Sequence, residues 1–232
     1  MPGFENARQQ FWSGARQIVP LALSAAVYGL AFGLLAAQAG LSAGQVGIMG
    51  TAIYAGASQI VATKQLVAGA SAMAAALAGA AINLRLLLIT ASIRDVYAGR
   101  PWWQVALGAH LTADENWALM LAERAKGRDV GYWYLFGGGL GQMVIWTLAT
   151  VAGVVFASAI PDPKSLGLDF AFTAAFIAIA RSLWKGSGDL IPWLTAAATV
   201  TAVAATGTLT PPWALILGGV AGAGLAAVLS RE

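Results

Sequence analysis

Five polar side chains lie in otherwise apolar stretches and are the ones that could do chemistry: Asn83, Arg85, His110, Asp114 and Glu115. More than ten largely apolar residues precede Asn83 and Arg85. A charged side chain at the centre of a membrane helix costs roughly 2.5–3.5 kcal/mol even on the lower scales. We therefore expect Arg85 to face the interior of a helix bundle, with Asp114 or Glu115 neutralising it.

The two carboxyl groups are adjacent, and adjacent residues on a helix point about 100° apart. They can share one small site only where the helix is unwound, so we expect a break there. A carboxyl group in a low-dielectric setting takes up and releases a proton near neutral pH, and His110, one turn before Asp114, could relay it. We predict proton coupling for His110, Asp114 and Glu115. A structural ion pair, a capped half-helix and a packed histidine are the competing interpretations.

A second polar interruption, Tyr54-Ala55-Gly56-Ala57-Ser58-Gln59, divides the apolar stretch 45–69. Its small residues would let the backbone approach a ligand closely, and Gln59 can donate and accept hydrogen bonds. The competing interpretation is close helix packing through small residues. The residues predicted to bind substrate are Tyr54, Gly56, Ala57, Ser58, Gln59, Asn83 and Arg85.

The elements that must position these residues are hydrophobic helices. Of the 232 residues, 59% are hydrophobic and 10% are charged, against roughly 25% charged in a soluble domain. We predict one all-α domain, residues 1–232, a polytopic membrane helix bundle with two interrupted helical segments and six to eight transmembrane segments. The apolar blocks are 18–39, 45–69, 71–92, 102–122, 131–160, 169–184, 190–206 and 212–229.

Basic residues cluster between these blocks, at Arg8 and Arg16, Arg94 and Arg100, Arg124 to Arg128, Arg181 and Lys185, and Arg231. The positive-inside rule would place all of them in the cytoplasm. That requires 45–69 and 102–122 each to enter and leave on one side, which gives six spans, two re-entrant hairpins and both termini in the cytoplasm. The alternative is eight spans with two external arginines.

Several function classes are excluded by residue content. The chain has no cysteine and one histidine, so no usual zinc or haem site can form, and we expect no metal, no cofactor and no enzymatic activity. No basic run could hold nucleic acid. The run Gly137 to Gly141 lies inside an apolar block without the context of a nucleotide site, and we interpret it as close helix packing.

Four ordered motifs, Tyr54 to Gln59, Asn83-Leu84-Arg85, Ala113-Asp114-Glu115 and Leu166 to Ala171, resemble the AzlC family of branched-chain amino acid permeases. The resemblance runs from about residue 11 onward. It implies proton-driven export of leucine, isoleucine, valine and sometimes methionine across a bacterial inner membrane. It also implies a partner, a small hydrophobic AzlD-type subunit.

The chain departs from the family pattern at two positions. Leu86 stands where a histidine commonly follows Asn-Leu-Arg, so no relay can use that position, and Ala113 stands where a threonine commonly precedes the acidic pair. Substrate choice could differ accordingly. A second hypothesis is a passive channel or a helical scaffold in a membrane complex. The preferred amino acid, the direction of transport, the coupling ion and the oligomeric state are left open by the sequence.

Overall fold

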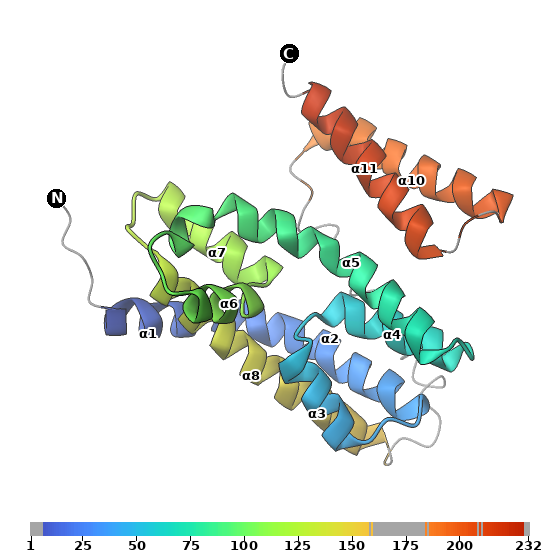
Figure 1. Ribbon diagram of the computed structural model, residues 1–232, viewed down its shortest axis with the longest axis horizontal. Coiled ribbons are helices and arrows are strands. Elements are labelled where there is room, and N and C mark those ends of the chain that lie inside the picture. The colour runs from blue at the N-terminus through green and yellow to red at the C-terminus, as the bar shows by residue number, and fades with distance from the viewer. Residues whose placement is uncertain are drawn as a thin grey trace. The chain divides into compact units, whose positions relative to one another are not determined.

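The computed structural model describes residues 7–157, 159, 184, 186–207, 209 and 211–229, and all regular elements of this part of the chain are helices (Figure 1). It divides into two compact units, Met1–Gly79 with Asn83–Phe172, and Ala80–Ile82 with Thr173–Glu232. The expected fold class, an all-α membrane bundle with two interrupted segments, is confirmed. The single domain over 1–232 stays a prediction.

The first unit holds the helices that carry every predicted site residue. They are α1 Ala7–Gln17, α2 Val19–Gln38, α3 Ala43–Ala52, α4 Gly56–Val67, α5 Ala72–Ser92, the 3-10 turn η1 Arg94–Tyr97, α6 Trp102–His110, α7 Asp114–Ala125 and α8 Tyr132–Ala157.

Helix starts and stops on the α3–α4 side follow from local chemistry. Ser42 caps α3 by accepting from the Gln45 amide, while the Gln45 side chain accepts from the Ser42 amide at 2.8 Å, a capping box. Ser71 caps α5. Gly40 follows α2 at φ +77° and Gly69 follows α4 at φ +81°, backbone values that only glycine adopts without strain.

Helix α8 is the centre of the unit, and glycines let its neighbours approach closely. Gly137 lies against the backbone of Phe11 in α1, and Gly153 lies against Leu30 and Gly33 in α2, where any Cβ atom would collide. Gly139 lies against the Leu111 carbonyl. The interpretation of the Gly137 to Gly141 run as a packing surface is therefore confirmed.

The stretch 45–69 is broken at 53–55, and the chain turns back there (Figure 1). Helix α3 runs opposite to α8 and helix α4 runs opposite to α5, while α5 and α8 are themselves antiparallel. Successive contacts along each pair show this: Gly47–Val151 and Gly50–Thr147, then Ala62–Gly79 and Ser58–Asn83. Helices α3 and α4 thus form a hairpin whose two open ends lie at the same end of the unit.

The stretch 102–122 is broken at 111–113 and forms a second hairpin, from the opposite end. Helix α6 runs with α8, and α7 runs with α5. The contacts along each pair are Gly108–Tyr132 and Leu111–Gly139, then Asp114–Arg85 and Trp117–Ser92. Both interruptions expected from the sequence are present, and both have the fold-back geometry of re-entrant segments rather than of straight spans.

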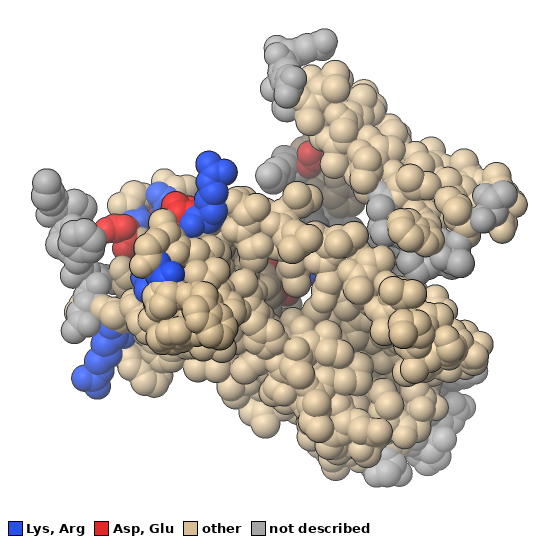
Figure 2. All heavy atoms as spheres, in the orientation of Figure 1, with Lys and Arg blue, Asp and Glu red and all other residues tan. Residues whose placement is uncertain are grey.

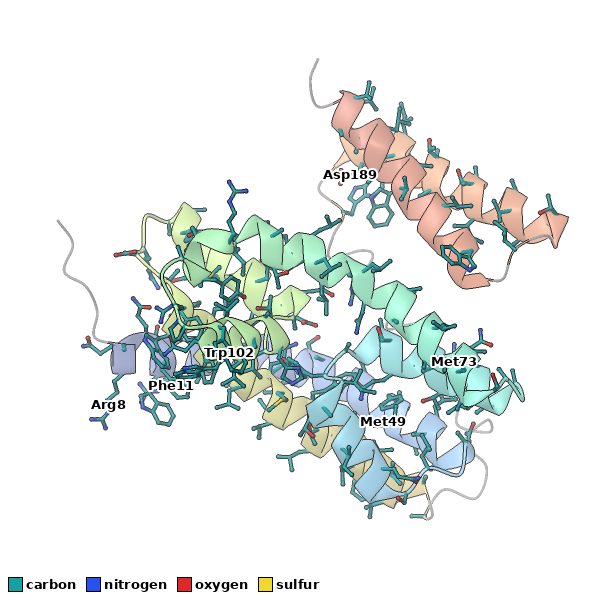
Figure 3. The ribbon with its side chains drawn as sticks, viewed as in Figure 1. Arg8, Phe11, Met49, Met73, Trp102 and Asp189 are labelled. Atoms are coloured by element: carbon teal, nitrogen blue, oxygen red, sulfur yellow. The ribbon has the colours of Figure 1, made fainter. Side chains whose placement is uncertain are left out.

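Charged side chains gather at one end of the first unit. Figure 2 shows them there, with a few charged atoms deep in a hollow nearer the middle, and Figure 3 shows Arg8 and Trp102 at that end and Met73 at the other. Three of the expected basic clusters meet here, because Arg124 pairs with Asp95 at 2.9 Å, Arg100 lies 4.1 Å from the Tyr132 ring centroid, and Gln10 of α1 bonds to the 129–131 turn. This grouping agrees with the re-entrant topology. Arg181, Lys185 and Arg231 lie outside the described residues.

Four helical segments of the described chain are long and apolar enough to cross a membrane: Val19–Gln38, Ala72–Ser92, Tyr132–Ala157 and Ser187–Thr206. The second unit contributes the 3-10 turn η2 Ser187–Asp189, α10 Leu190–Thr206 and α11 Pro211–Leu229. Gly218 and Gly222 of α11 pack against the Ala196 region of α10. The expected block 169–184 lies almost wholly outside the described residues.

Candidate functional site

Helix α5 connects the two broken segments through residues two positions apart. The Ser58 hydroxyl, in the first turn of α4, donates to Oδ1 of Asn83 at 2.7 Å. Nη2 of Arg85 lies 2.8 Å from Oδ2 of Asp114, the first residue of α7. The Asn83-Leu84-Arg85 motif therefore contacts the N-terminal turn of both returning half-helices.

The break at 53–55 is strained, and its half-helix has no side-chain cap. Tyr54 has a φ of +44°, unfavourable for a bulky side chain. Its hydroxyl donates to the Gly139 carbonyl at 3.2 Å, which holds the ring against α8. Ala55 occupies the N-cap position of α4 and supplies no hydrogen bond from its side chain. Gly56 and Ala57 are only partly buried, and the first amides of a helix have no partner within it, so this N-terminus favours an anion.

The break at 111–113 is held by hydrogen bonds from two side chains, those of Asn116 and Thr112. Asn116 is buried, and its Oδ1 accepts from the Ala113 amide at 2.7 Å. Its Nδ2 donates to the carbonyls of Leu111 at 2.9 Å and Leu135 at 3.1 Å. Thr112 adds a bond to the Gly108 carbonyl at 2.7 Å. The half-helix that follows begins with Asp114, whose negative charge suits a helix N-terminus.

The two breaks meet through His110. Its Nε2 lies 2.8 Å from the Thr51 carbonyl at the end of α3, and its ring centroid lies 6.2 Å from that of Tyr54. His110 ends α6, so the C-terminal ends of two half-helices come together at this imidazole. The negative ends of two half-helix dipoles therefore point at this side chain.

Arg85 has the carboxylate partner expected for it, but the pair is less buried than expected. The side chains of Arg85 and Asp114 are 48% and 43% exposed. The pair bridges α5 and α7 across an open side of the break, so that half of each side chain stays accessible. Glu115 is half-buried beside it and acts electrostatically on the hydroxyls of Tyr28 and Tyr54. An accessible pair can exchange partners at lower cost than a sealed one.

The AzlC protein family matches residues 20–160, more than half of the chain, and this range contains both breaks and the α5 motif. The chain belongs to the AzlC family.

Its relatives share the membrane setting. The AzlC-family chain is 29% identical to the inner membrane protein YgaZ of Escherichia coli K12 over 217 residues, covering 91% of this chain and 87% of YgaZ. It is 29% identical to an uncharacterized membrane protein of Helicobacter pylori J99 over 181 residues, 78% of each chain. No solved structure matches it. The family and these relatives mark it as a membrane protein related to transport.

Two residues of this AzlC-family site were missed by reasoning from the sequence. Trp146 donates from Nε1 to Oε1 of Gln59 at 3.0 Å, and its six-membered ring lies over Gly56. The side chain of Asn116 holds the second break together by hydrogen bonds. The role of Asn116 could have been predicted from the sequence, because it is the third residue of a half-helix, where a side chain can hydrogen-bond to the N-cap backbone. The role of Trp146 could not have been predicted, because nothing in the sequence distinguishes it from any other tryptophan of an apolar helix.

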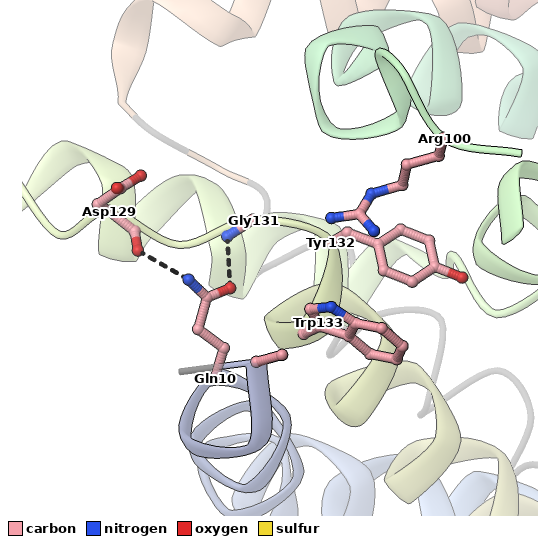
Figure 4. A pocket seen from close by; sticks show the side chains of 7 residues that line it. Gln10, Arg100, Asp129, Gly131, Tyr132 and Trp133 are labelled. Carbon is pink, nitrogen blue, oxygen red and sulfur yellow. Dashed lines mark hydrogen bonds between the residues drawn. The ribbon is translucent and has the colours of Figure 1, made fainter. Parts of the chain in front are cut away.

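A cleft of about 270 Å³ lies apart from this site, at the basic end of the unit (Figure 4). Gln10 closes one side of it by bonding to the Asp129 carbonyl and the Gly131 amide. Arg100 lies over Tyr132 on the other side. None of the predicted substrate or proton residues lines it.

Proposed function

We propose that this chain is the large subunit of a proton-coupled secondary transporter that exports branched-chain amino acids, namely leucine, isoleucine and valine and in some cases methionine. The observation that carries the proposal is the meeting of two half-helix N-termini from opposite ends at Asn83 and Arg85. Paired helix breaks of this kind form midplane binding sites in secondary transporters.

The substrate carboxylate would bind the uncapped amides of Gly56 and Ala57 at the start of α4. Free N–H groups and the positive end of the helix favour an anion there, and Ala55 offers no competing oxygen. Gln59 and Asn83 would bind the remaining polar atoms. The branched side chain would face the apolar residues around them.

Arg85 and the acidic pair would link substrate to protons. A substrate carboxylate that reaches Arg85 would displace Asp114, and the freed Asp114 or its neighbour Glu115 would then take up a proton. When the substrate leaves, the proton is released and the Arg85–Asp114 pair re-forms. Binding and protonation are then coupled through one guanidinium group, because its charge favours whichever carboxylate lies next to it.

The setting proposed for this cycle is the bacterial inner membrane, with both termini in the cytoplasm. The name of the E. coli relative and the grouping of basic residues at one end support it. The proposed partner is a small hydrophobic AzlD-type subunit. The proposal involves no bond-making chemistry, metal or cofactor.

The test is leucine efflux from proteoliposomes that contain this chain and its small partner. Wild-type efflux should be saturable and driven by a pH gradient, and Glu115→Gln should retain leucine binding but lose the pH drive. Asp129→Asn changes an acidic residue in a loop away from the site. It is the matched control and should behave as wild type. Efflux of Glu115→Gln that is still driven by pH would remove Glu115 from the mechanism, and failure of the wild type to move leucine would reject the substrate class.

Arg85→Lys tests the guanidinium separately. Lysine keeps the charge but cannot form the paired hydrogen bonds of arginine to a carboxylate. Leucine affinity should fall by about tenfold, equivalent to about 1.4 kcal/mol. Normal affinity in this variant would place the substrate carboxylate on the α4 amides alone.

A further inference from the structure

Trp146 fills the space between the proposed carboxylate site and the far end of the first unit. A Cβ atom at position 56 would lie 2.7 Å from Cη2 of the Trp146 ring, so the ring contacts the first residue of α4 directly. On the other side the ring stacks on Phe32 of α2, with centroids 6.3 Å apart and planes at 11°, and lies 5.8 Å from the Tyr28 centroid. The indole is held from both sides.

Polar atoms on α4 and α8, the two helices that this ring joins, are buried without hydrogen-bond partners. They are Nε2 of Gln59 and Oγ1 of Thr63 on α4, and Oε1 of Gln142 and Oγ1 of Thr147 on α8. Gln59 and Thr63 have no exposed surface at all. Gln142 lies one turn before Trp146 on α8, toward the basic end. We call the α4 and α8 surfaces that carry the other three atoms, those of Gln59, Thr63 and Thr147, the polar seam.

The polar seam follows one helix face. Gly56, Gln59 and Thr63 are three and four residues apart, so they lie in one row along α4. Gly56 and Gln59 both contact Trp146, which directs that row toward α8. Thr147 lies on the neighbouring part of α8, against Gly50 of α3. The row continues from the break toward the end of the unit opposite the basic residues.

Buried polar atoms in proteins are nearly always hydrogen-bonded, so a row of unpaired ones needs a reason. Apolar side chains would fill a permanently closed interface better. The atoms would be satisfied by water or by a solute if α4 moved away from α8. Broken half-helices that move against a scaffold are the usual moving parts of transporters with alternating access.

We propose that Trp146 is the closed gate of the described state, and that the polar seam behind it is the substrate path to the end of the unit opposite the basic residues. This inference rests on the proposed transport function. In the described state Trp146, Tyr28 and Phe32 close the path, and the hydrogen bond from Trp146 to Gln59 latches α4 to α8. When the latch opens, Gln59, Thr63 and Thr147 line a wet passage.

The chain has no native cysteine, so single introduced thiols can report on this passage without background. Thr63→Cys is the reporter variant, and Ala22→Cys, at a buried position of α2 outside the apolar cluster that contains Trp146 and Phe32, is the matched control variant. Both are reconstituted with the small partner and treated with a membrane-impermeant methanethiosulfonate reagent. The thiol of the reporter variant should react from the aqueous phase about tenfold faster than that of the control variant, because a minor open state exposes it, and saturating leucine should change its rate.

Trp146→Phe keeps an aromatic ring but removes the hydrogen bond to Gln59. Added to the reporter variant, it should raise the reactivity of the thiol further, and added to the control variant it should change nothing. Trp146→Ala should act more strongly, and Trp146→Phe serves if the alanine variant does not fold. Equal, slow reactivity of the reporter and control thiols in all variants overturns the gate. A reactive reporter thiol that responds to Trp146→Phe but not to leucine, in a protein that does not move leucine, supports the gate and rejects the proposed substrate.

Discussion

Each of the two helix breaks of the first unit interrupts the hydrogen bonding of a helix backbone, and the residues around the two breaks differ. The break at 111–113 satisfies its own polar groups, through the buried amide of Asn116 and the hydroxyl of Thr112, and provides its own anions in the first turn of α7. The break at 53–55 has a strained Tyr54 and no acid in the first turn of α4. The N-cap residue is an alanine at both breaks.

This difference indicates that the two breaks have different functions. An N-terminus that already carries carboxylates is suited to hold and exchange protons, whereas one without acids in its first turn is suited to hold an anion that binds and leaves. Asn83 and Arg85 contact one break each, so a change at either break can reach the other through α5. Mutations that add or remove a hydrogen bond at one break should therefore have unequal effects on stability and transport.

Asn116→Ala should have the largest effect on stability. It removes three hydrogen bonds, to the Ala113 amide and to the carbonyls of Leu111 and Leu135, a loss of about 3 kcal/mol. Thermal unfolding in detergent measures it. Asn83→Ala, which removes a single bond to the other break, should lose about 1 kcal/mol. Equal losses in the two variants would show that the breaks are not differently built.

Acid should loosen the hairpin that carries 111–113 through its buried carboxylate. Glu123 is 4% exposed, and its pKa is lowered by a hydrogen bond from Lys126 at 2.7 Å and by the Arg128 charge; the pKa of Asp95 is lowered by its hydrogen bond from Arg124. A lowered folded pKa gives stability that is present above the ordinary value, about 4.3 for a glutamate, and lost as the pH falls below it.

Glu123→Gln measures this contribution. It should lower stability at pH 7 by about 2 kcal/mol, the usual loss for hydrogen bonds to a charged group. The melting temperature of the variant should also fall less steeply than that of the wild type between about pH 5 and about pH 3. An unchanged acid profile would place the acid-sensitive groups elsewhere.

Ala55→Ser should separate stability from transport. A serine at the N-cap of α4 can accept from the first amides and should stabilise the protein by about 1 kcal/mol, while it competes with the substrate carboxylate and weakens leucine binding. Ala113→Ser offers the same cap to α7, whose N-cap alanine makes no side-chain hydrogen bond either, and is the matched control: it should stabilise the protein by a similar amount and leave leucine affinity unchanged. Unchanged leucine affinity in Ala55→Ser would argue against the α4 amides as the carboxylate site.

Tyr54→Phe should have the smallest effect. It removes the hydrogen bond from Tyr54 to the Gly139 carbonyl and keeps both the ring and the positive φ, so the loss should be about 1 kcal/mol or less. Equilibrium melting against wild type measures it. A much larger loss would show that this hydroxyl, rather than the packing of the ring, fixes the break.

Much of the fold could be predicted from the sequence, because each prediction depended on local chemistry. Long apolar blocks, glycine and serine at their ends, and polar interruptions at 54–59 and 110–116 were enough to predict a helical membrane bundle with two breaks. The Arg85–Asp114 pair followed from the cost of a lone charge at that depth. The Gly137 to Gly141 surface followed from the absence of side chains in an apolar block.

The sequence alone determined which groups are too costly to leave in lipid and where the backbone of a helix must break, because those depend on residue type and spacing. Only the tertiary structure decided how those groups are paired: that Asn83 contacts one break and Arg85 the other, that His110 reaches the Thr51 carbonyl, and that Trp146 lies over Gly56. These contacts join residues 25 to 90 positions apart. They depend on the direction in which each half-helix folds back, which no local pattern contains.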